Sequence, residues 1–247
     1  MSEATTEEPI ATGTVEATAP VATAGAGKTD DELKKFGAVI AVCALLLLFG
    51  GETFAVWHVN VETDFVDENS ETWEVDIKFG TKEMYVEQPE ALTPEGGDGT
   101  DSDSWEYDDS DVDLDEVADF FSNLKILLYV LLIGGAALGY MGHTGEKMEF
   151  APKVIAGAAL VSVLILLYTF FSLPAAYDED TDFFDDMRED PAFFSDNKDK
   201  IGEGTMLEAE KHANTTFSIG FFVPLISLGV AGYLINNRGI KLEDITG

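Results

Sequence analysis

Four long apolar stretches divide the chain, and strongly acidic segments separate the first from the second and the third from the fourth. The stretches are residues 36–58, 118–141, 153–176 and 215–235. An α-helix rises about 1.5 Å per residue, so about 20 apolar residues cross a hydrocarbon core of about 30 Å. Each stretch has this length. The pattern therefore predicts four membrane-spanning helices, spans 1 to 4, packed as a bundle in a mainly α membrane protein.

A second pattern, with a period of two residues, begins where span 1 ends. Apolar and β-branched or aromatic residues alternate with polar ones over residues 57–65 and again over 73–79. Such alternation is typical of strands with one buried face, and the acidic break between the two runs predicts a turn. We expect an antiparallel hairpin over 57–79, with a third short run at 83–86. Because an isolated hairpin is marginal, its apolar face needs cover from a third strand, the second acidic loop or a partner.

Lysine and arginine residues indicate which side of the membrane each segment occupies. Basic residues flank the spans in the first segment, in the 142–152 connection and in the last segment, at Lys28, Lys34, Lys35, Lys147, Lys153, Arg238 and Lys241. The connection 59–117 holds 21 acids against two bases, and the connection 177–214 holds 13 acids against four. Basic residues near span ends stay cytoplasmic. The sequence therefore predicts a multi-pass plasma membrane protein with both termini in the cytoplasm and two acidic extracytoplasmic loops.

The remaining segments have simpler compositions. Residues 1–35 are rich in Ala, Thr, Glu and Pro, which predicts a disordered cytoplasmic tail. Residues 94–116 are mostly Gly, Asp, Ser and Glu, and we expect a mobile acidic segment there. A short helix over 205–212 is expected to lead into span 4. Residues 236–247 form a cytoplasmic tail.

The net charge of −33 and the pI of about 4.1 exclude some partners. Nucleic acid binding requires clustered lysine and arginine, and docking on anionic lipid requires a basic surface. Such an acid excess resembles the proteins of halophilic archaea, in which carboxylates retain water in brine. The alternative is one acidic protein from an ordinary cell.

Small residues within the spans predict where helices approach closely. Gly135 and Gly139 lie four residues apart in span 2, as do Ala158 and Ser162 in span 3. Small residues at this spacing let helix backbones approach each other in lipid. We therefore expect spans 2 and 3 to pack closely. Pro224 lies in the middle of span 4 and is expected to kink it.

Two ionisable residues fall within apolar stretches, which is costly in lipid. Glu52 lies six residues inside the outer end of span 1, and Lys125 lies seven residues inside the outer end of span 2. Their opposite charges at matched depth suggest an intramembrane ion pair that sets the register of the two helices. In the alternative, Lys125 extends its amine toward the interface and Glu52 is neutral or hydrated.

Motifs for catalysis are missing from the sequence. It contains no nucleophile motif, no HExxH metalloprotease motif and no phosphate-binding loop. The single cysteine, Cys43, allows no intramolecular disulfide. We expect a protein that is not an enzyme and that needs no cofactor.

One acidic stretch has oxygen ligands suited to calcium. Asp98, Asp101 and Asp103 alternate with Gly and Ser in residues 96–103. The stretch resembles one copy of a calcium-binding β-roll repeat, but Asp103 stands where that repeat has a large apolar residue. Plain solvation or diffuse cation condensation is the main expectation, and specific Ca²⁺ binding is the alternative.

The arrangement resembles the claudin and peripheral-myelin-protein class of four-span membrane proteins. The resemblance rests on four spans, on a first outer loop that opens as a strand directly after span 1 (57–65, then 73–79), and on a shorter second outer loop. It implies a four-helix bundle that carries a small extracellular sheet built from both loops. The first-loop disulfide and the tryptophan signature of claudins are absent here, so no barrier or adhesion activity is carried over.

These observations predict a structural or protein-interaction module that presents an acidic extracellular β-layer. Its partner would be an unidentified protein or a second copy, bound through the outer loops. The alternative is an accessory subunit of a transporter or channel, with outer loops that concentrate cations.

Overall fold

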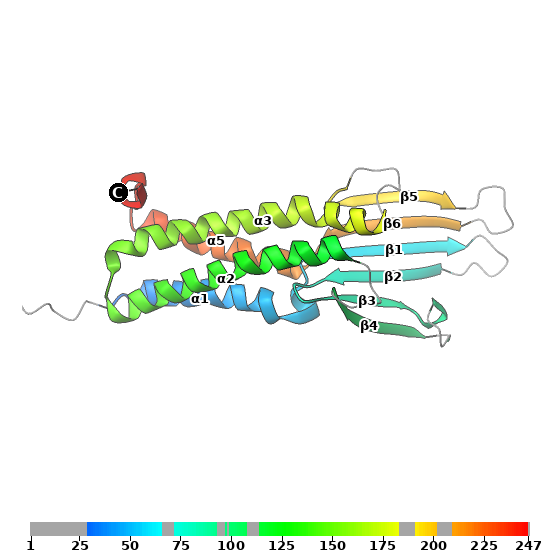
Figure 1. Cartoon of the computed structure of the whole chain (residues 1–247), viewed down its shortest axis with the longest axis horizontal. Coiled ribbons are helices and arrows are strands. Elements are labelled where there is room, and N and C mark those ends of the chain that lie inside the picture. The colour runs from blue at the N-terminus through cyan, green and yellow to red at the C-terminus, as the bar shows by residue number, and fades with distance from the viewer. Residues whose placement is uncertain are drawn as a thin grey trace, which may run out of the picture.

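The chain folds into a helical bundle and a six-stranded sheet that lie end to end (Figure 1). The computed structural model describes residues 29–65, 72–92, 97, 99–107, 114–182, 191–201 and 209–246. The helices are α1 (Asp31–Phe49), α2 (Asp115–Thr144), α3 (Ala151–Thr181), α5 (Ile219–Asn237) and α6 (Leu242–Thr246), with 3-10 turns η1 (Gly51–Phe54), η2 (Glu90–Leu92) and η3 (Met148–Phe150). The strands are β1 (Trp57–Phe65), β2 (Thr72–Phe79), β3 (Glu83–Pro89), β4 (Thr100–Glu106), β5 (Ser195–Ile201) and β6 (Ala209–Phe217).

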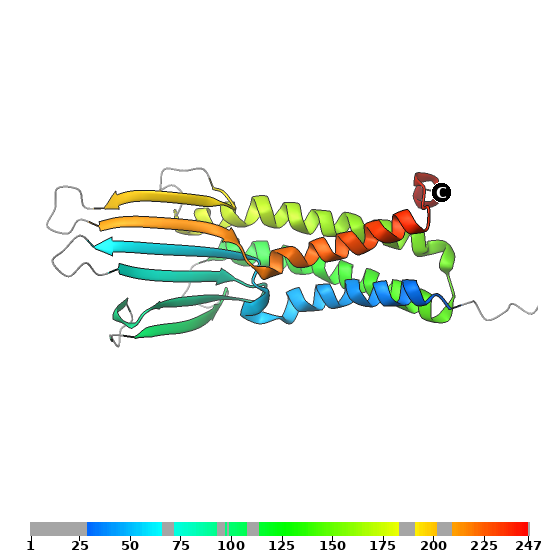
Figure 2. The same ribbon diagram turned by 180° about the vertical axis from the view of Figure 1, so that it is seen from behind.

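The four long helices run side by side, and the sheet extends from one end of them (Figures 1 and 2). The start of α1, the turn between α2 and α3, and the C-terminal α6 all lie at the opposite end. Both acidic connections therefore contribute strands at the same end of the bundle, and the termini of the described chain lie together at the other.

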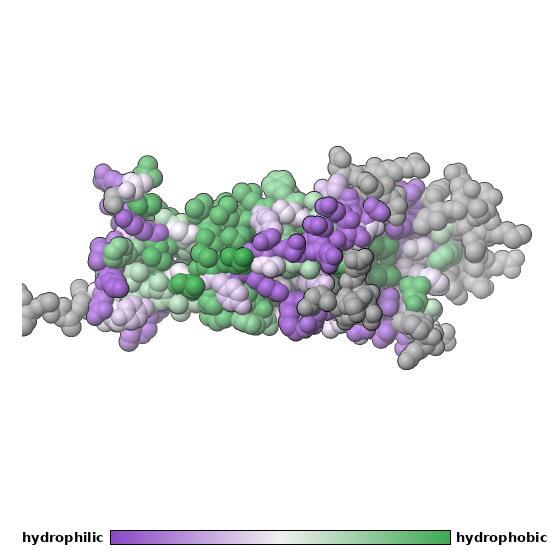
Figure 3. All heavy atoms as spheres, viewed as in Figure 1, coloured by the Kyte–Doolittle hydropathy of each residue, from purple (hydrophilic) through white to green (hydrophobic). Residues whose placement is uncertain are grey.

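Three helices are long and apolar enough to cross a membrane, namely α2, α3 (together with η3) and α5. On the face drawn in Figure 3, apolar side chains gather over the middle of the bundle, with hydrophilic side chains toward both of its ends. These features indicate a membrane protein. The fourth long helix, α1, begins with four charged residues within its first five positions, and its apolar part, 36–49, is about 21 Å long at the helical rise. A fourth span therefore stays a prediction.

The prediction that residues 36–58 form one helix is wrong. Helix α1 ends at Phe49, where the Gly50 N–H donates to the carbonyl of Leu46. Gly51 then adopts a positive φ of 61°, which glycine tolerates without steric cost. After η1 the chain is already a strand at Trp57. Hydropathy did not reveal this boundary because a buried strand and a buried helix are equally apolar.

The sheet is antiparallel throughout, with the strand order β4-β3-β2-β1-β6-β5. Strand β1 pairs with β2 from Trp57↔Phe79 to Asp64↔Thr72, which is the hairpin that the alternation predicted. On its other side β1 pairs with β6, from Trp57↔Phe217 onward. The second acidic connection thus supplies the strands that continue the hairpin into a larger sheet.

Two segments of the acidic connections have structures that the sequence patterns did not predict. Residues 100–106, expected to be mobile, form the edge strand β4, which pairs with β3 from Pro89↔Thr100 to Glu83↔Glu106. Residues 209–217 form β6, so the helix predicted over 205–212 is wrong for 209–212, and residues 205–208 lie outside the described part. Span 4, predicted to begin at residue 215, is helical only from Ile219.

Helices α1 and α2 approach each other closely, through the glycines that were expected to pack α2 on α3. A Cβ added to Gly37 of α1 would lie 2.4 Å from the backbone nitrogen of Gly139, and one added to Gly135 would lie 2.5 Å from that of Ala41. On α3, Ala158 and Ser162 are buried, but the Ser162 hydroxyl donates within the helix to the Ala158 carbonyl, at 2.9 Å. The α2 glycines pack on α1 because Gly37 has no side chain, so the two helix backbones can approach each other there.

Two of the long apolar helices contain a proline. Pro224 lies inside α5 and is buried, as the sequence placed it within span 4. Pro174 lies inside α3 and is also buried, close to the end of the helix that meets the sheet. A proline leaves the carbonyl four residues earlier without its helical hydrogen bond.

An aromatic cluster joins the bundle to the sheet. The rings of Trp57 and Phe79 each contact Tyr177 of α3, with centroid distances of 5.5 and 5.1 Å. Phe193, which precedes β5, packs on Trp57 and on Phe221 of α5. Buried rings of this kind stabilise through area and through edge-to-face contact. The sheet base and the helix ends therefore share one hydrophobic core.

Candidate functional site

The two faces of the sheet differ in polarity. Residues paired across neighbouring strands share a face, so Trp57, Val59, Phe79 and Met84 lie on the face that contains the buried residues. The opposite face is polar across the strands that the structure describes. It includes His58, Asn60, Glu62, Glu74, Asp76, Lys78, Tyr85, Glu87, Ser102, Ser104, His212 and Asn214.

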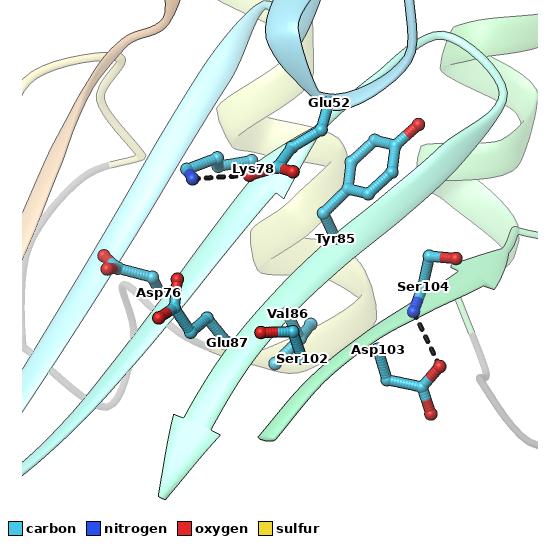
Figure 4. A pocket seen from close by; sticks show the side chains of 9 residues that line it. All are labelled: Glu52, Asp76, Lys78, Tyr85, Val86, Glu87, Ser102, Asp103 and Ser104. Atoms are coloured by element: carbon cyan, nitrogen blue, oxygen red, sulfur yellow. Dashed lines mark hydrogen bonds and ion pairs between the residues drawn. The ribbon is translucent and has the colours of Figure 1, made fainter. Parts of the chain in front are cut away.

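A groove lies in this sheet next to the bundle, with a volume of about 320 Å³ (Figure 4). Its lining comes from η1 and from strands β2, β3 and β4. The residues are Glu52, Asp76, Lys78, Tyr85, Val86, Glu87, Ser102, Asp103 and Ser104. Four of them are acids and one is a base. Asp103 pairs with Val86 and so belongs to the opposite face of the sheet, which leaves Glu52, Asp76 and Glu87 around Lys78, an excess of two negative charges at neutral pH. We consider this acidic groove the candidate functional site.

Glu52 and Lys78 form an ion pair at the bundle end of the acidic groove, with 2.7 Å between Oε1 and Nζ. The hydrogen bond to Glu52 raises the pKa of Lys78 above its ordinary value, although partial burial opposes this. Glu52 was predicted to pair inside the membrane with Lys125. Instead, Glu52 lies in η1, after the end of α1, with 53% of its side chain exposed.

Lys125 lies elsewhere, and no ion pair joins it to Glu52 among the described residues. It is half-buried on α2, and its charge acts on Glu106 of β4. Glu106 pairs with Lys82 at 2.7 Å, and this contact lowers the pKa of Glu106. The depth argument misplaced Glu52 because it assumed that the helix continued to residue 58.

Asp76 is the most extensively bonded carboxylate of the acidic groove. Its Oδ1 atom lies 2.7 Å from Nε2 of His58 and accepts a hydrogen bond from the Asn60 amide at 2.8 Å. Burial tends to raise the pKa of Asp76, but the bonds from Asn60 and His58 outweigh burial and lower that pKa. Neither Asp76 nor His58 was predicted as a site residue. Their signal was the alternation itself, which places both on the polar face of adjacent strands.

Tyr85 forms part of the wall between β3 and η1. Burial, together with the Glu83 carboxylate that accepts its hydroxyl hydrogen bond at 2.9 Å, raises the pKa of Tyr85 to about 12. Its hydroxyl therefore stays protonated and can donate a hydrogen bond at physiological pH. On the same face, toward the other edge of the sheet, His212 of β6 makes a similar cross-strand contact, with 2.5 Å between its Nε2 and the Asp196 carboxylate.

The predicted calcium ligands are only partly within the described residues. Asp98 lies outside them, and Asp101 and Asp103 occupy exposed positions on the edge strand β4. Asp103 is also in the lining of the acidic groove, but it pairs with Val86 and its side chain belongs to the opposite face of the sheet, where its Oδ1 accepts from the Ser104 N–H at 2.7 Å. Within the described ranges, no three His, Cys, Asp or Glu side chains are grouped as metal ligands. Calcium binding stays a prediction.

The chemistry of the acidic groove favours binding of a cation. Ionised carboxylates accept hydrogen bonds and attract positive charge, while the Lys78 ammonium has N–H donors beyond the one that it gives to Glu52. No known family model matches the chain, and no curated protein matches it.

Proposed function

We propose that the chain is a non-enzymatic four-span membrane protein whose sheet stands outside the cell and binds a basic partner protein through the acidic groove. The single observation that supports this most is the excess of two carboxylates over bases on the polar side of a groove of about 320 Å³. A basic side chain of a partner would find several acceptors there. Charge complementarity of this kind raises association rates and selects partners.

The connection between sheet and bundle supports a presenting role. Strand β1 follows α1 after one 3-10 turn, and β6 is separated from α5 by Ser218 alone. The backbone N–H of Gly220 also donates to the Ala55 carbonyl at 2.7 Å. Two helices thus anchor two adjacent central strands, which holds the acidic groove at a defined distance from the bundle.

We propose that the chain shares the architecture of the claudin-like class that the sequence resembles. In that class both outer loops form one sheet on a four-helix bundle, and here β6 of the second acidic connection pairs with β1 of the first. We propose the same orientation, with both termini in the cytoplasm of a plasma membrane. The acidic composition further suggests a salt-loving archaeal source.

Orientation can be tested with single cysteines in a Cys43→Ser background. Thr72→Cys lies exposed at the outer end of β2, and Glu146→Cys lies exposed in the turn between α2 and α3. A membrane-impermeant maleimide added to intact cells should label position 72 and spare position 146 until the cells are opened. The opposite labelling pattern would contradict the proposed orientation.

Partner binding can be tested by crosslinking in native membranes, followed by purification of the chain. The variant Glu87→Lys/Ser102→Lys places two positive charges on paired, exposed positions of the groove. It should lose a partner that the wild type captures. The control Glu146→Lys/Glu149→Lys makes the same number of substitutions at exposed positions far from the sheet and should retain the partner. Equal capture by both variants would refute a role for the acidic groove.

A subunit of a cation channel or transporter is the second candidate, favoured by the same carboxylates, which raise the local cation concentration. In this case the Glu87→Lys/Ser102→Lys variant would lower the conductance of the assembled complex without releasing the chain from it. Conductance and copurification measured on the same membranes distinguish the two functions.

A further inference from the structure

A second groove lies between α2 and α3, at the end of the bundle next to the sheet, and its volume is about 380 Å³. Three carboxylates line it, from Glu116 and Asp119 in the first turns of α2 and from Glu179 near the end of α3. Three aromatic rings also line it, those of Phe120, Tyr168 and Phe171. We call it the interfacial groove. It belongs to helices that are both long and apolar enough to cross a membrane.

The walls of the interfacial groove are held together at two points. The Phe120 and Tyr168 rings stack between the helices, with centroids 4.8 Å apart and planes 18° from parallel. Near the rim, the Asp180 carboxylate of α3 accepts hydrogen bonds from the backbone N–H groups of Glu116 and Val117, at 3.1 and 2.9 Å. These bonds cap the start of α2. The spacing between the two helices is therefore fixed before any ligand binds.

The rim of the interfacial groove is negative and has no counter-charge of its own. Glu116, Asp119 and Glu179 are exposed, and no lysine, arginine or histidine is among the described lining residues. Glu116 experiences Coulombic repulsion from Glu179 and Asp119. Figure 3 shows hydrophilic side chains beside the apolar band where α2 begins and α3 ends. A bound cation would relieve this repulsion.

The floor of the groove continues into the apolar surface of the bundle. Phe171 is 67% exposed, and Leu167, Leu164 and Leu160 follow at helical spacing on α3, each at least 43% exposed. Such a stripe on a spanning helix faces lipid chains. An aromatic floor beneath a carboxylate rim also suits an ammonium group, because aromatic faces attract cations.

We propose that the interfacial groove binds an amphiphile with a cationic headgroup. The ammonium lies among Glu116, Asp119 and Glu179, and the hydrocarbon chain extends along the Leu160–Phe171 stripe. Charge complementarity at the rim and continuity with the apolar stripe both favour a lipid-like occupant over a soluble cation or a polar peptide. This inference does not depend on the acidic groove of the sheet or on which side of the membrane the sheet occupies.

The test uses the full chain in dodecyl maltoside, titrated with dodecyltrimethylammonium at fixed ionic strength and followed by tryptophan fluorescence during heating. At about ten times Kd the Tm of the wild type should rise by roughly 3–5 °C. Tetramethylammonium, which has the headgroup without the chain, should give no shift. The maltoside already supplies the same chain on a neutral headgroup, so a shift reports the charge. An equal shift with tetramethylammonium would overturn the proposal.

The variant Glu116→Gln/Asp119→Asn/Glu179→Gln should weaken the apparent Kd for dodecyltrimethylammonium roughly tenfold, because three exposed ion pairs are lost. The control Glu146→Gln/Glu149→Gln/Glu243→Gln removes equal charge from the opposite end and should bind like the wild type. Unchanged affinity in the groove variant would refute the proposal. A dodecylammonium probe with a diazirine in its chain should also label wild-type residues 160–175. Labelling spread evenly over the helices would contradict the site even if a variant were to misfold.

Discussion

The Trp57 indole Nε1 donates a hydrogen bond of 3.0 Å to the backbone carbonyl of Phe193, which is 136 residues away in the chain. Trp57 is fully buried, and Phe193 is 2% exposed. The bond connects the first residue of the central strand β1 to the segment that leads into β5. It therefore joins both acidic connections at the point where the sheet meets the helices.

Replacing Trp57 should separate the contribution of this bond from that of the ring. Trp57→Phe keeps most of the aromatic packing but leaves the buried Phe193 carbonyl without its donor, which should cost about 1–3 kcal/mol. Trp57→Ala also leaves a cavity and should cost about 3–5 kcal/mol. Reversible unfolding in detergent, followed by far-UV circular dichroism, measures both. A Trp57→Phe variant as stable as the wild type would show that the hydrogen bond contributes little, and equal losses for the two variants would show that the ring contributes little beyond the bond.

The α1–α2 crossing predicts sharply different effects for neighbouring glycines. A Cβ at Gly135 would lie 2.5 Å from backbone, so Gly135→Ala forces the helices apart and should cost about 1–3 kcal/mol. Gly134 has nothing within 4 Å of an added Cβ, so Gly134→Ala should be neutral or slightly stabilising. Thermal unfolding of the pair of variants provides the comparison, with Gly134→Ala as the matched control. Similar Tm values would argue against this crossing.

At the end of the bundle away from the sheet, an ion pair joins the end of α5 to the start of α1. Arg238 Nη2 lies 2.7 Å from Asp30 Oδ2, with side-chain exposures of 21% and 23%, and a second carboxylate, Glu32, lies 3.5 Å away. Asp30 also caps α1 by accepting the Leu33 N–H at 3.0 Å. Arg238→Gln should therefore destabilise the chain by about 1–2 kcal/mol.

A double-mutant cycle separates the free energy of the Arg238–Asp30 ion pair from that of the helix cap that Asp30 provides. Asp30→Asn retains a side-chain oxygen for the Leu33 N–H but removes the charge. If the pair stabilises the fold, the cost of Arg238→Gln should shrink when Asp30 is already Asn, as measured by unfolding in detergent. Strict additivity of the two substitutions would contradict a direct interaction.

The lowered pKa of Asp76 predicts that the folded protein loses stability in acid. Its folded pKa lies below the ordinary value of 3.8, so its ionised form stabilises the native sheet. This contribution is complete at pH values above about 3.8 and is lost as the pH falls through the lower folded pKa. Asp76→Asn should therefore be less stable than the wild type at pH 6, with the difference narrowing below pH 3.8. Thermal unfolding across this range, with exposed Asp64→Asn as control, measures the effect. A constant difference at all pH values would contradict the assignment to ionisation.

Local patterns identified much of the fold. Span 2 was predicted at 118–141 and is helical over Asp115–Thr144, because a long apolar run between charged segments has few alternatives in water or lipid. The β1–β2 hairpin followed from alternation, since a shift of one residue would turn Trp57, Val59 and Phe79 away from the core. The acidic groove was not predicted, although the polar positions that line it on β2 were visible in the same alternation.

The apolar segments, the β pattern after the first of them and the strong negative charge could all be predicted, because each depends on residues close together in the chain. The end of α1 at Phe49, the strand at residues 100–106, the pairing of Glu52 with Lys78 and the contact of Gly37 with Gly139 are set only when the chain folds. Each of these last features depends on contacts between segments distant in sequence. Local propensity and hydropathy carry no information about which distant segment will supply a hydrogen bond, a charge or a gap of the right size.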